Sequence, residues 1–386
     1  MNSVNQHLIA AAIVAFLLAG ATVVGANAQD LNEAKNRYVV TNLVSDLAGK
    51  AKVLDPILQN AWGVVFIPSA SPFWIADNAT GCSTLYDGDG TIVPLQVKIP
   101  LPGGKVPATA CQHLNPAAKT PAAPTGLVWN ATTTFLVPGT KLPATFIFAT
   151  EDGTISAWTG GLTPANAAVL AVDNPNTASG AVYKGLVFGT NVNGVFLFAT
   201  NFRAGKIDVF APAPAGSTTG HYVPATTDGG FMDPSIPPSY APFGIQNING
   251  DLFVTYAKQN AQKNADVPGL GHGFVDVFDT DGHLLRRFAT RGELNSPWGV
   301  ARASFAFGKF SGDILIGNFG DGNINVYDSK GLFLAQLKDT NGNPLVIHKL
   351  WTLTLGGGAK SSSDTLYFTA GPNNETNGLF GTITLP

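Results

Sequence analysis

The sequence predicts an all-β fold, a six-bladed β-propeller with four antiparallel strands in each blade. Three observations predict it. A short phrase with a central glycine occurs six times, its copies lie 63, 59, 59, 55 and 53 residues apart, and strand-like sequence fills the intervals. A period of this size is typical of repeat arrays and propellers. The centres of the copies are Gly63, Gly126, Gly185, Gly244, Gly299 and, in a degenerate last copy, Thr352.

Each copy opens with a short strand that carries the glycine. We expect these strands to converge at the axis of the ring, where a side chain at the glycine position would clash with its neighbours. An aromatic residue often precedes the glycine, as at Trp62, Phe243 and Trp298. We expect these rings to be structural wedges rather than platforms for a ligand.

The other strands follow in the same order in every copy. A second strand is rich in aromatic and β-branched residues, as at 73–76 and 146–149. A third strand alternates with a period of two, as at 206–210, which places one side chain in a core and the next outside. A turn rich in Asp and Gly then leads to a fourth strand, as at 284–288.

The last copy lacks a fourth strand, because it runs out after 379–383. The segment 38–44 precedes the first copy and is strand-like, yet it has no blade of its own. We therefore expect it to pair with the last blade and to close the ring. Closure removes the exposed edge that an open repeat array must otherwise cover.

The N-terminal sequence predicts a signal peptide over 1–28, followed by a single propeller domain over 29–386. Residues 8–24 are apolar or small, and the run from Ala26 to Ala28 matches a cleavage signal. We expect cleavage after Ala28 and a secreted or periplasmic protein. The first seven residues contain no Lys or Arg, and the apolar run nearly reaches the length of a membrane span. An uncleaved N-terminal anchor is therefore the alternative.

Composition narrows the range of partners. Charged residues make up 12% of the chain and the net charge is −3, which gives no basic field for nucleic acid. No stretch after residue 28 approaches the length of a membrane span. We also expect the protein to be a monomer.

The chain has two cysteines. In an exported chain Cys82 and Cys111 are expected to form one disulfide that pins the first loop between blades. Two unpaired thiols are the alternative.

Polar residues at the ends of the second strands form the candidate site. In a propeller these ends surround the axis on one face, together with the loops that precede the inner strands. The predicted ligand-binding ring consists of Asp77, Asn78, Glu151, Asp152, Asn201, Arg203, Lys258, Asn318 and Asp321. Further members of this face are Lys184, Gln246, His348 and Glu375. Such an oxygen-rich ring is a possible cradle for Ca²⁺. The alternative is that Asn and Asp cap strand ends and bond to the turning backbone.

Catalytic signatures are scarce, so the catalytic residues stay unassigned. The five histidines after residue 28 form no zinc-binding pattern, and no G-x-S-x-G nucleophile motif occurs. One insertion, 258–272, is unusually long. Long loops on a rigid scaffold often carry function, so this insertion is a candidate lid or rim.

Several segments carry a family resemblance. The segments 282–288 and 294–300 resemble the NHL-repeat signature, in which a G-x-L strand leads to N-x-P-x-G. The segments 295–301 and 317–328 are similar to an uncharacterised family of exported bacterial six-bladed propellers with NHL-like repeats, and 148–156 and 366–371 match it as well. The resemblance covers most of the chain from residue 38 onward, and it implies the fold but no activity.

A more distant resemblance is to propellers of the gluconolactonase type, which include metal-dependent lactonases, lyases and pure binding modules. The lactonase type holds its cation on the axis with Glu, Asn and Asp side chains. By residue type and position, the resemblance implies Glu151, Asn201 and Asn318 as metal ligands here.

These observations predict a ligand- or protein-binding module that acts through its axial face. The alternative is a metal-dependent hydrolase or lyase of the gluconolactonase-like type, with Glu151 or Asp321 as a base beside a bound cation. At this point the sequence leaves open whether the chain is an enzyme. A redox propeller with a quinone cofactor has no positive support in the sequence.

Overall fold

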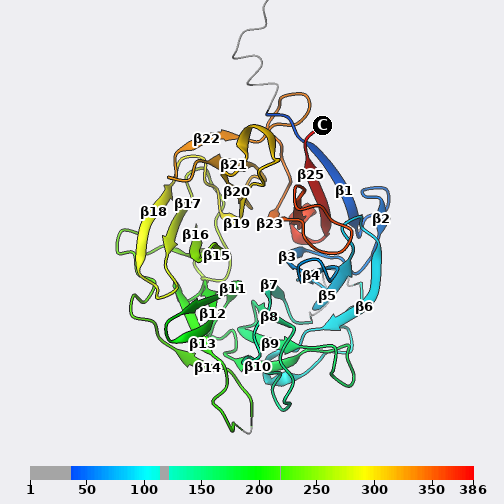
Figure 1. Cartoon of the computed structure of the whole chain (residues 1–386), viewed down its shortest axis with the longest axis vertical. Helices are drawn as coiled ribbons and strands as arrows, with labels where there is room; N and C mark the ends of the chain where they lie inside the picture. Colours follow the sequence, from blue (N-terminus) through cyan, green and yellow to red (C-terminus); the bar gives the residue numbers. More distant parts are fainter. Residues whose placement is uncertain (1–35, 114–120, 218) are drawn as a thin grey trace, which may run out of the picture.

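The structure is a computed structural model that describes residues 36–113, 121–217 and 219–386. Six sheets surround one axis (Figure 1); each contains four antiparallel strands, and one sheet carries a short fifth strand in addition. The predicted six-bladed propeller is therefore confirmed. Short helical turns lie in the loops; they are η1 (Pro102–Gly104), η2 (Gly308–Phe310) and α2 (Pro372–Glu375).

The blades follow one another along the chain, and their strands run from the axis outward. Blade 1 consists of β3 (Ala61–Val65), β4 (Phe73–Asp77), β5 (Cys82–Tyr86) and β6 (Ile92–Lys98). Blade 2 consists of β7 (Pro124–Trp129), β8 (Phe146–Thr150), β9 (Thr154–Trp158) and β10 (Val169–Asp173). Blade 3 consists of β11 (Tyr183–Asn191), β12 (Gly194–Asn201), β13 (Lys206–Ala211) and β14 (Val223–Ala225).

The second half of the ring repeats this arrangement. Blade 4 consists of β15 (Tyr240–Ile248), β16 (Asp251–Lys258), β17 (Gly273–Phe278) and β18 (Leu284–Thr290). Blade 5 consists of β19 (Pro297–Arg302), β20 (Ile314–Asn318), β21 (Ile324–Tyr327) and β22 (Phe333–Gln336). Blade 6 consists of β23 (Leu350–Leu355), β24 (Leu366–Ala370), β25 (Leu379–Thr384) and β1 (Val39–Ser45).

The N-terminal strand closes the ring as predicted. β1 pairs antiparallel with β25, from Val39 opposite Thr384 to Ser45 opposite Leu379. A short fifth strand, β2 (Val53–Leu54), adds to β1 in parallel, which the sequence did not predict. Closure therefore joins both ends of the described chain within one sheet (Figure 1).

The repeated glycines allow the inner strands to approach one another closely. A Cβ atom built on Gly63 would lie 2.4 Å from the carbonyl oxygen of Thr125, and one on Gly244 would lie 2.2 Å from that of Trp298. Such contacts are too short for any side chain, so the predicted clash is confirmed. In the degenerate copy the hydroxyl of Thr352 instead donates a hydrogen bond to the Trp62 carbonyl, at 2.8 Å.

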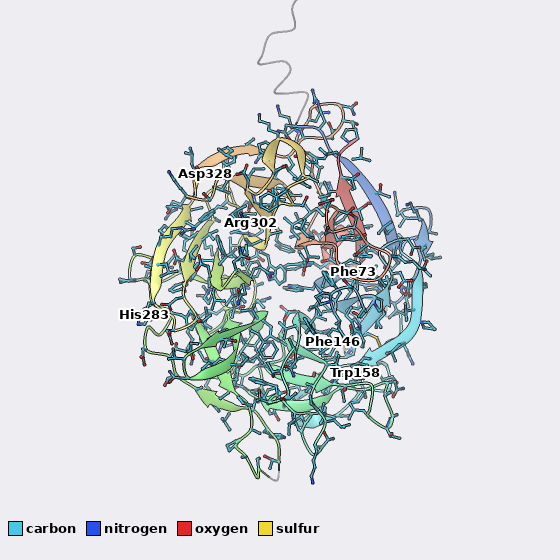
Figure 2. The ribbon with its side chains drawn as sticks, viewed as in Figure 1. Phe73, Phe146, Trp158, His283, Arg302 and Asp328 are labelled. Carbon is cyan, nitrogen blue, oxygen red and sulfur yellow. A yellow bond between two sulfur atoms is a disulfide. The ribbon has the colours of Figure 1, made fainter. Side chains whose placement is uncertain are left out.

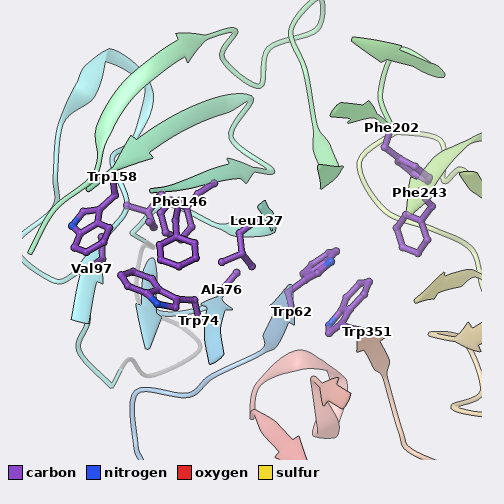
Figure 3. Close-up of a cluster of buried hydrophobic side chains, with 14 of the residues drawn as sticks. Trp62, Trp74, Ala76, Val97, Leu127, Phe146, Trp158, Phe202, Phe243 and Trp351 are labelled. Atoms are coloured by element: carbon purple, nitrogen blue, oxygen red, sulfur yellow. The ribbon is translucent and has the colours of Figure 1, made fainter. Parts of the chain in front are cut away.

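Aromatic side chains fill the centre of the ring. The rings of Trp62 and Trp351 stack with their centroids 3.4 Å apart (Figure 3). Phe319 also stacks on Trp351, with the centroids 4.0 Å apart. Phe243 is fully buried beside them. These rings are structural, as predicted, although they pack on one another at the axis. We call the set Trp62, Phe202, Phe243, Trp298, Phe319 and Trp351 the aromatic plug.

Buried aromatic side chains also hold neighbouring blades together. Trp74 of blade 1 lies 4.2 Å from the ring of Phe146 and 4.6 Å from that of Trp158, both in blade 2 (Figures 2 and 3). Burying one such side chain stabilises the fold by about 1.5–3 kcal/mol. A threonine adds a polar link between blades 3 and 4, because the Thr200 hydroxyl donates to the Phe243 carbonyl at 3.0 Å.

The predicted disulfide is present. Cys82 in β5 is bonded to Cys111 in the loop that leads to blade 2. The predicted signal peptide over 1–28 lies outside the described residues and stays a prediction, as does the domain boundary at residue 29. Within the described residues, no helix is long and apolar enough to cross a membrane.

Candidate axial binding site

The inner strands begin on the same face of the ring on which the second strands end. Pro124 at the start of β7 lies opposite Thr150 at the end of β8, and Tyr183 at the start of β11 lies opposite Asn201 at the end of β12. The residues just before the inner strands and just after the second strands therefore meet around the axis. We call this side of the molecule the axial face.

A buried ion pair stands at the centre of this face. The ammonium of Lys184, in β11, pairs with Oε1 of Glu151, in the turn after β8. The Lys184 side chain is 4% exposed, whereas 28% of the Glu151 side chain remains accessible. The ammonium lies 5.1 Å from the ring centroid of Trp62 and within 6 Å of the rings of Phe202 and Phe243. The aromatic plug is thus a cation–π floor beneath the pair.

Two asparagines connect this pair to a second carboxylate. Asn78 donates from Nδ2 to Oε2 of Glu151 at 3.1 Å. Asn60 donates from Nδ2 to Asn78 Oδ1 at 3.1 Å and to Oε2 of Glu375 at 3.3 Å. The indole Nε1 of Trp351 donates in turn to Asn60 Oδ1, at 2.9 Å. Residues from blades 1, 2, 3 and 6 therefore form one polar network above the plug.

Three further charges lie within electrostatic reach of the pair. Burial raises the pKa of Glu375, and the nearby Glu151 carboxylate raises it further, while Lys184 and Lys349 lower it. Burial also raises the pKa of Asp266, while the charges of Lys184 and Lys349 lower it. Lys349 lies 4.0 Å above the Phe319 ring and forms no ion pair within the described residues. We call Glu151, Lys184, Asp266, Lys349 and Glu375 the axial charge cluster.

The backbone before three of the inner strands is strained. Asn60, Ser296 and Lys349 each stand three residues before the centre of the repeated phrase, and their φ angles are 47°, 47° and 58°. This left-handed conformation costs roughly 1–2 kcal/mol for a residue other than glycine. Strain of this kind collects at functional sites, where the surrounding structure holds it in place. Here the strained residues stand at the start of the inner strands of blades 1, 5 and 6.

The long insertion is an ordered part of the rim. Gln259 pairs with Asp266 in an isolated antiparallel bridge, and the side-chain Nε2 of Gln259 donates to the Phe202 carbonyl. The amide of Gly269 donates to Oδ1 of Asn295 at 2.7 Å. The insertion thereby brings Asp266 into the axial charge cluster. Its predicted place at the rim of the axial face is consistent with these contacts.

The structure brings only some of the predicted site residues together. Glu151, Asn78, Lys184 and Glu375 belong to one network. Asp77 is fully buried, its carboxylate has no hydrogen-bond partner among the described residues, and burial raises its pKa well above the ordinary range. It is not part of that network.

The remaining predicted residues secure loops. Asp152 accepts a hydrogen bond from the Ala123 amide at 2.7 Å. Arg203 donates to Asn176 and to the carbonyl of Gln262, and Asp321 accepts from Asn295 at 3.1 Å. Lys258 ends β16, where its carbonyl accepts the amide of Val267 at 2.8 Å, and Gln246 lines a cavity of about 40 Å³ on the axis between the inner strands. His348 is exposed.

The three predicted metal ligands do not fit a shared cation as the structure places them. Asn201 Oδ1 accepts the amide of Ala204 at 3.2 Å, and Asn318 Oδ1 accepts the amide of Asn295 at 3.1 Å. Both asparagines therefore cap strand ends, while Glu151 already neutralises an ammonium. Across the part of the chain that the structure describes, no three His, Cys, Asp or Glu side chains are grouped as a metal site.

Sequence reasoning did not single out Asn60, Asp266 or Lys349, and it gave Lys184 no special weight. One signal marks Lys184. The residue before the centre of the phrase is Trp or Phe in four copies and Thr in one, but in the third copy it is Lys184. A lysine thus occupies a position at which four of the six copies supply an aromatic ring of the plug.

The comparisons with known proteins agree with this architecture. No protein-family model matches the chain. Uncharacterized protein R648 of Acanthamoeba polyphaga mimivirus is 30% identical over 353 residues, which cover 90% of this chain and 80% of that protein. The chain belongs to the family of this mimivirus protein. Uncharacterized protein L690 of the same virus is also 30% identical over 353 residues, with 90% and 85% covered.

These relatives are viral, so the expected membership in an exported bacterial family stays a prediction. A solved structure of a protein of unknown function from Bacteroides thetaiotaomicron is 9% identical and covers 90% of this chain and 76% of its own, with a TM-score of 0.51. At this identity the likeness shows the fold alone.

Proposed function

We propose that the chain is a binding module whose axial face takes a polar, hydroxyl-rich ligand at the axial charge cluster. The observation that carries the proposal is the Lys184–Glu151 pair, whose buried lysine stands where four other blades contribute an aromatic ring. The accessible part of Glu151 leaves one side of the pair open to a ligand.

Packing alone does not require this lysine. Desolvating an ion pair costs several kcal/mol per ion, and replacing such a pair with apolar residues of similar size is often neutral or stabilising. Four blades fill the same position with Trp or Phe. Groups of interacting, partly buried charges are typical of functional sites. The pair is therefore better explained by a ligand than by stability.

The chemistry of the face fits hydroxyl groups. Glu151 and Glu375 offer hydrogen-bond acceptors, Lys349 offers donors, and Asn78 offers both. Hydroxyl groups donate and accept at once, so a polyhydroxylated ligand can satisfy neighbouring groups of opposite kind. An acidic group on the ligand would have an unpaired ammonium to meet at Lys349.

The test is calorimetric titration of the wild-type protein with gluconate, glucuronate and glucose. We expect the two sugar acids to bind more tightly than glucose, and we expect Lys349→Met and Glu151→Gln to weaken them at least tenfold. Lys360→Met is the matched control, because Lys360 pairs with Asp87 away from the axial face. Equal binding by all four proteins, or by none, would contradict the proposal.

The metal-dependent hydrolase or lyase is the second candidate. Its support is the electrostatic influence of Glu151 and Asp266 on Glu375, since carboxylate oxygens are the ligands that Ca²⁺ prefers, although the three side chains are not grouped as a metal site in the described residues. The Lys184 ammonium opposes it, because it already neutralises Glu151. Thermal unfolding with Ca²⁺ and with a chelator separates the two candidates. Stabilisation of the wild-type protein by Ca²⁺ that Glu151→Gln abolishes would favour the metal-dependent candidate.

A further inference from the structure

A pocket of about 730 Å³ lies between blades 2 and 3, away from the axial charge cluster. Strand β10 provides one wall, and β13 and β14 provide the other. We call it the blade 2–3 pocket. Its volume is within the range of roughly 300–1,000 Å³ that small-molecule sites occupy.

The pocket exists because the outer strand of blade 3 is short. β14 contains three residues, whereas the outer strands β6 and β18 contain seven each. Its pairing with β13 begins at Val209 opposite Ala225 and runs only to Ala211 opposite Val223. The first half of β13, from Lys206 to Asp208, therefore has no outer neighbour in the sheet.

The connection between β13 and β14 reaches across to blade 2. The Tyr222 amide donates to the Ala171 carbonyl at 3.1 Å, and the Gly139 amide donates to the Thr219 carbonyl at 3.2 Å. These bonds hold the two blades together at one side of the pocket. The connection between β13 and β14 therefore closes the space between the blades on that side.

The interior of the pocket is apolar. Ile207, Val209, Phe210 and Phe231 line it and are each less than a tenth exposed. Ala171 faces them from β10, and its small side chain contributes to the free volume. Such walls suit a flat or compact hydrocarbon body, whose burial removes apolar surface from water and is therefore favourable.

The lining charges favour a cationic ligand over an anionic one. Asp173 and Asp208 both line the pocket, and the single lysine in the lining, Lys206, already pairs with Asp208 Oδ1 at 2.8 Å. The Lys206 side chain is 62% exposed, so a ligand ammonium can displace it with little loss of packing. The other oxygen of Asp208 stays fixed by the hydroxyl of Tyr183, at 3.1 Å.

Two further polar groups mark the pocket. The hydroxyls of Tyr222 and Thr227, which line it, are buried and have no hydrogen-bond partner among the described residues. Native proteins pair most buried polar groups with protein or water. A bound molecule, or ordered water, would supply the missing hydrogen-bond partners.

We infer that the blade 2–3 pocket binds a small molecule with an apolar, aromatic body and a primary ammonium group, and that the ammonium pairs with Asp208 and Asp173. This site is independent of the proposed function of the axial face. The ligand would enter past the exposed residues Asp173, Lys206, His221 and Thr226.

The test is calorimetric titration of the full chain with tryptamine, which has an indole body and an ammonium group. Indole-3-propionate, with the same body and a carboxylate, is the paired probe. We expect saturable binding of tryptamine at one site and at least tenfold weaker binding of indole-3-propionate. Equal affinities would overturn the charge assignment, and an absence of saturable tryptamine binding would overturn the site.

Three variants place the binding in this pocket. Thr226→Trp fills the mouth from an exposed position and should abolish tryptamine binding; His221→Trp is the second choice if the first variant does not fold. Lys206→Ala removes the competing ammonium and should tighten binding by about threefold, a change of the size that exposed ion pairs produce. Lys360→Met, which lies at neither site, should leave tryptamine binding unchanged. Unchanged affinity in both Trp variants would place the ligand elsewhere and overturn the inference.

Discussion

Two lysine–carboxylate pairs stand in opposite settings in this ring. Lys184 and Glu151 meet at the axis with 4% of the lysine side chain exposed, whereas Lys206 and Asp208 meet at the blade 2–3 pocket with 62% exposed. The axis holds a cavity of about 40 Å³, and the blade 2–3 pocket measures about 730 Å³. The pair with the buried lysine therefore lies where the inner strands converge, whereas the larger cavity lies beside the short outer strand β14.

The largest expected effect concerns the floor of the axial site. Trp351→Ala removes a fully buried ring that stacks on both Trp62 and Phe319, and it should lower the free energy of unfolding by about 3–5 kcal/mol. Urea unfolding followed by circular dichroism measures the loss. Phe333→Ala, at an outer position with the side chain 40% exposed, is the control and should cost less than about 1 kcal/mol. Similar losses at both positions would mean that the plug does not hold the centre of the ring.

The next effect concerns the axial pair itself. Lys184→Met should lower the free energy of unfolding by about 2–3 kcal/mol, because it leaves the partly buried Glu151 carboxylate without its ammonium. Methionine has a similar length and suits the aromatic surroundings. The double variant Lys184→Met with Glu151→Gln should recover most of this loss. If the double variant is as unstable as the sum of both single variants, the two residues are not coupled and the pair is misassigned.

A smaller effect is the pH dependence that the axial charges create. Burial raises the pKa of Glu375 in the folded state, so the folded state binds this proton more tightly than the unfolded state does. The free energy of unfolding therefore falls as the pH rises from the unfolded pKa, about 4.3, through the folded pKa. Glu375→Gln should remove this fall, and chemical unfolding at several pH values between about 4 and 7 measures it.

An exposed aspartate provides the control of opposite sign. The Leu332 amide donates to Asp328 at 2.9 Å and lowers the pKa of that carboxyl. Its contribution is present above the unfolded pKa and is lost as the pH falls, so Asp328→Asn should lower stability above about pH 4, and the difference from the wild-type protein should disappear at lower pH. Identical pH profiles for Glu375→Gln and the wild-type protein would show that Glu375 is not held in a buried environment.

The fold could be predicted because its determinants are local and repeated. The glycine phrase marks each inner strand, and the close approach at Gly63 and Gly244 explains why the phrase recurs. The missing strand of the last copy predicted the pairing of β1 with β25. The disulfide between Cys82 and Cys111 could be predicted because the chain has two cysteines and is expected to be exported.

The site could be predicted only in part, because a position on the correct face does not fix where a side chain points. Glu151 and Asn78 bond to each other across two blades, whereas Asn201 caps the turn that follows it and Asn318 caps the loop before β19. Asp266 reaches the cluster through an insertion whose path no repeat predicts. The blade 2–3 pocket depends on where β14 stops pairing, which the sequence pattern does not reveal.

The smallest expected effect returns to the pair at the pocket. Lys206→Ala should change the free energy of unfolding by no more than about 0.5 kcal/mol, because an exposed ion pair contributes little. Asp208 keeps its hydrogen bonds from Tyr183 and Asn201, so its carboxylate does not lose all partners. Urea unfolding beside Lys184→Met, under identical conditions, measures the contrast. If Lys206→Ala lowers the free energy of unfolding as much as Lys184→Met does, exposure does not distinguish the two pairs. The burial of Lys184 would then be no argument for a ligand at the axial pair.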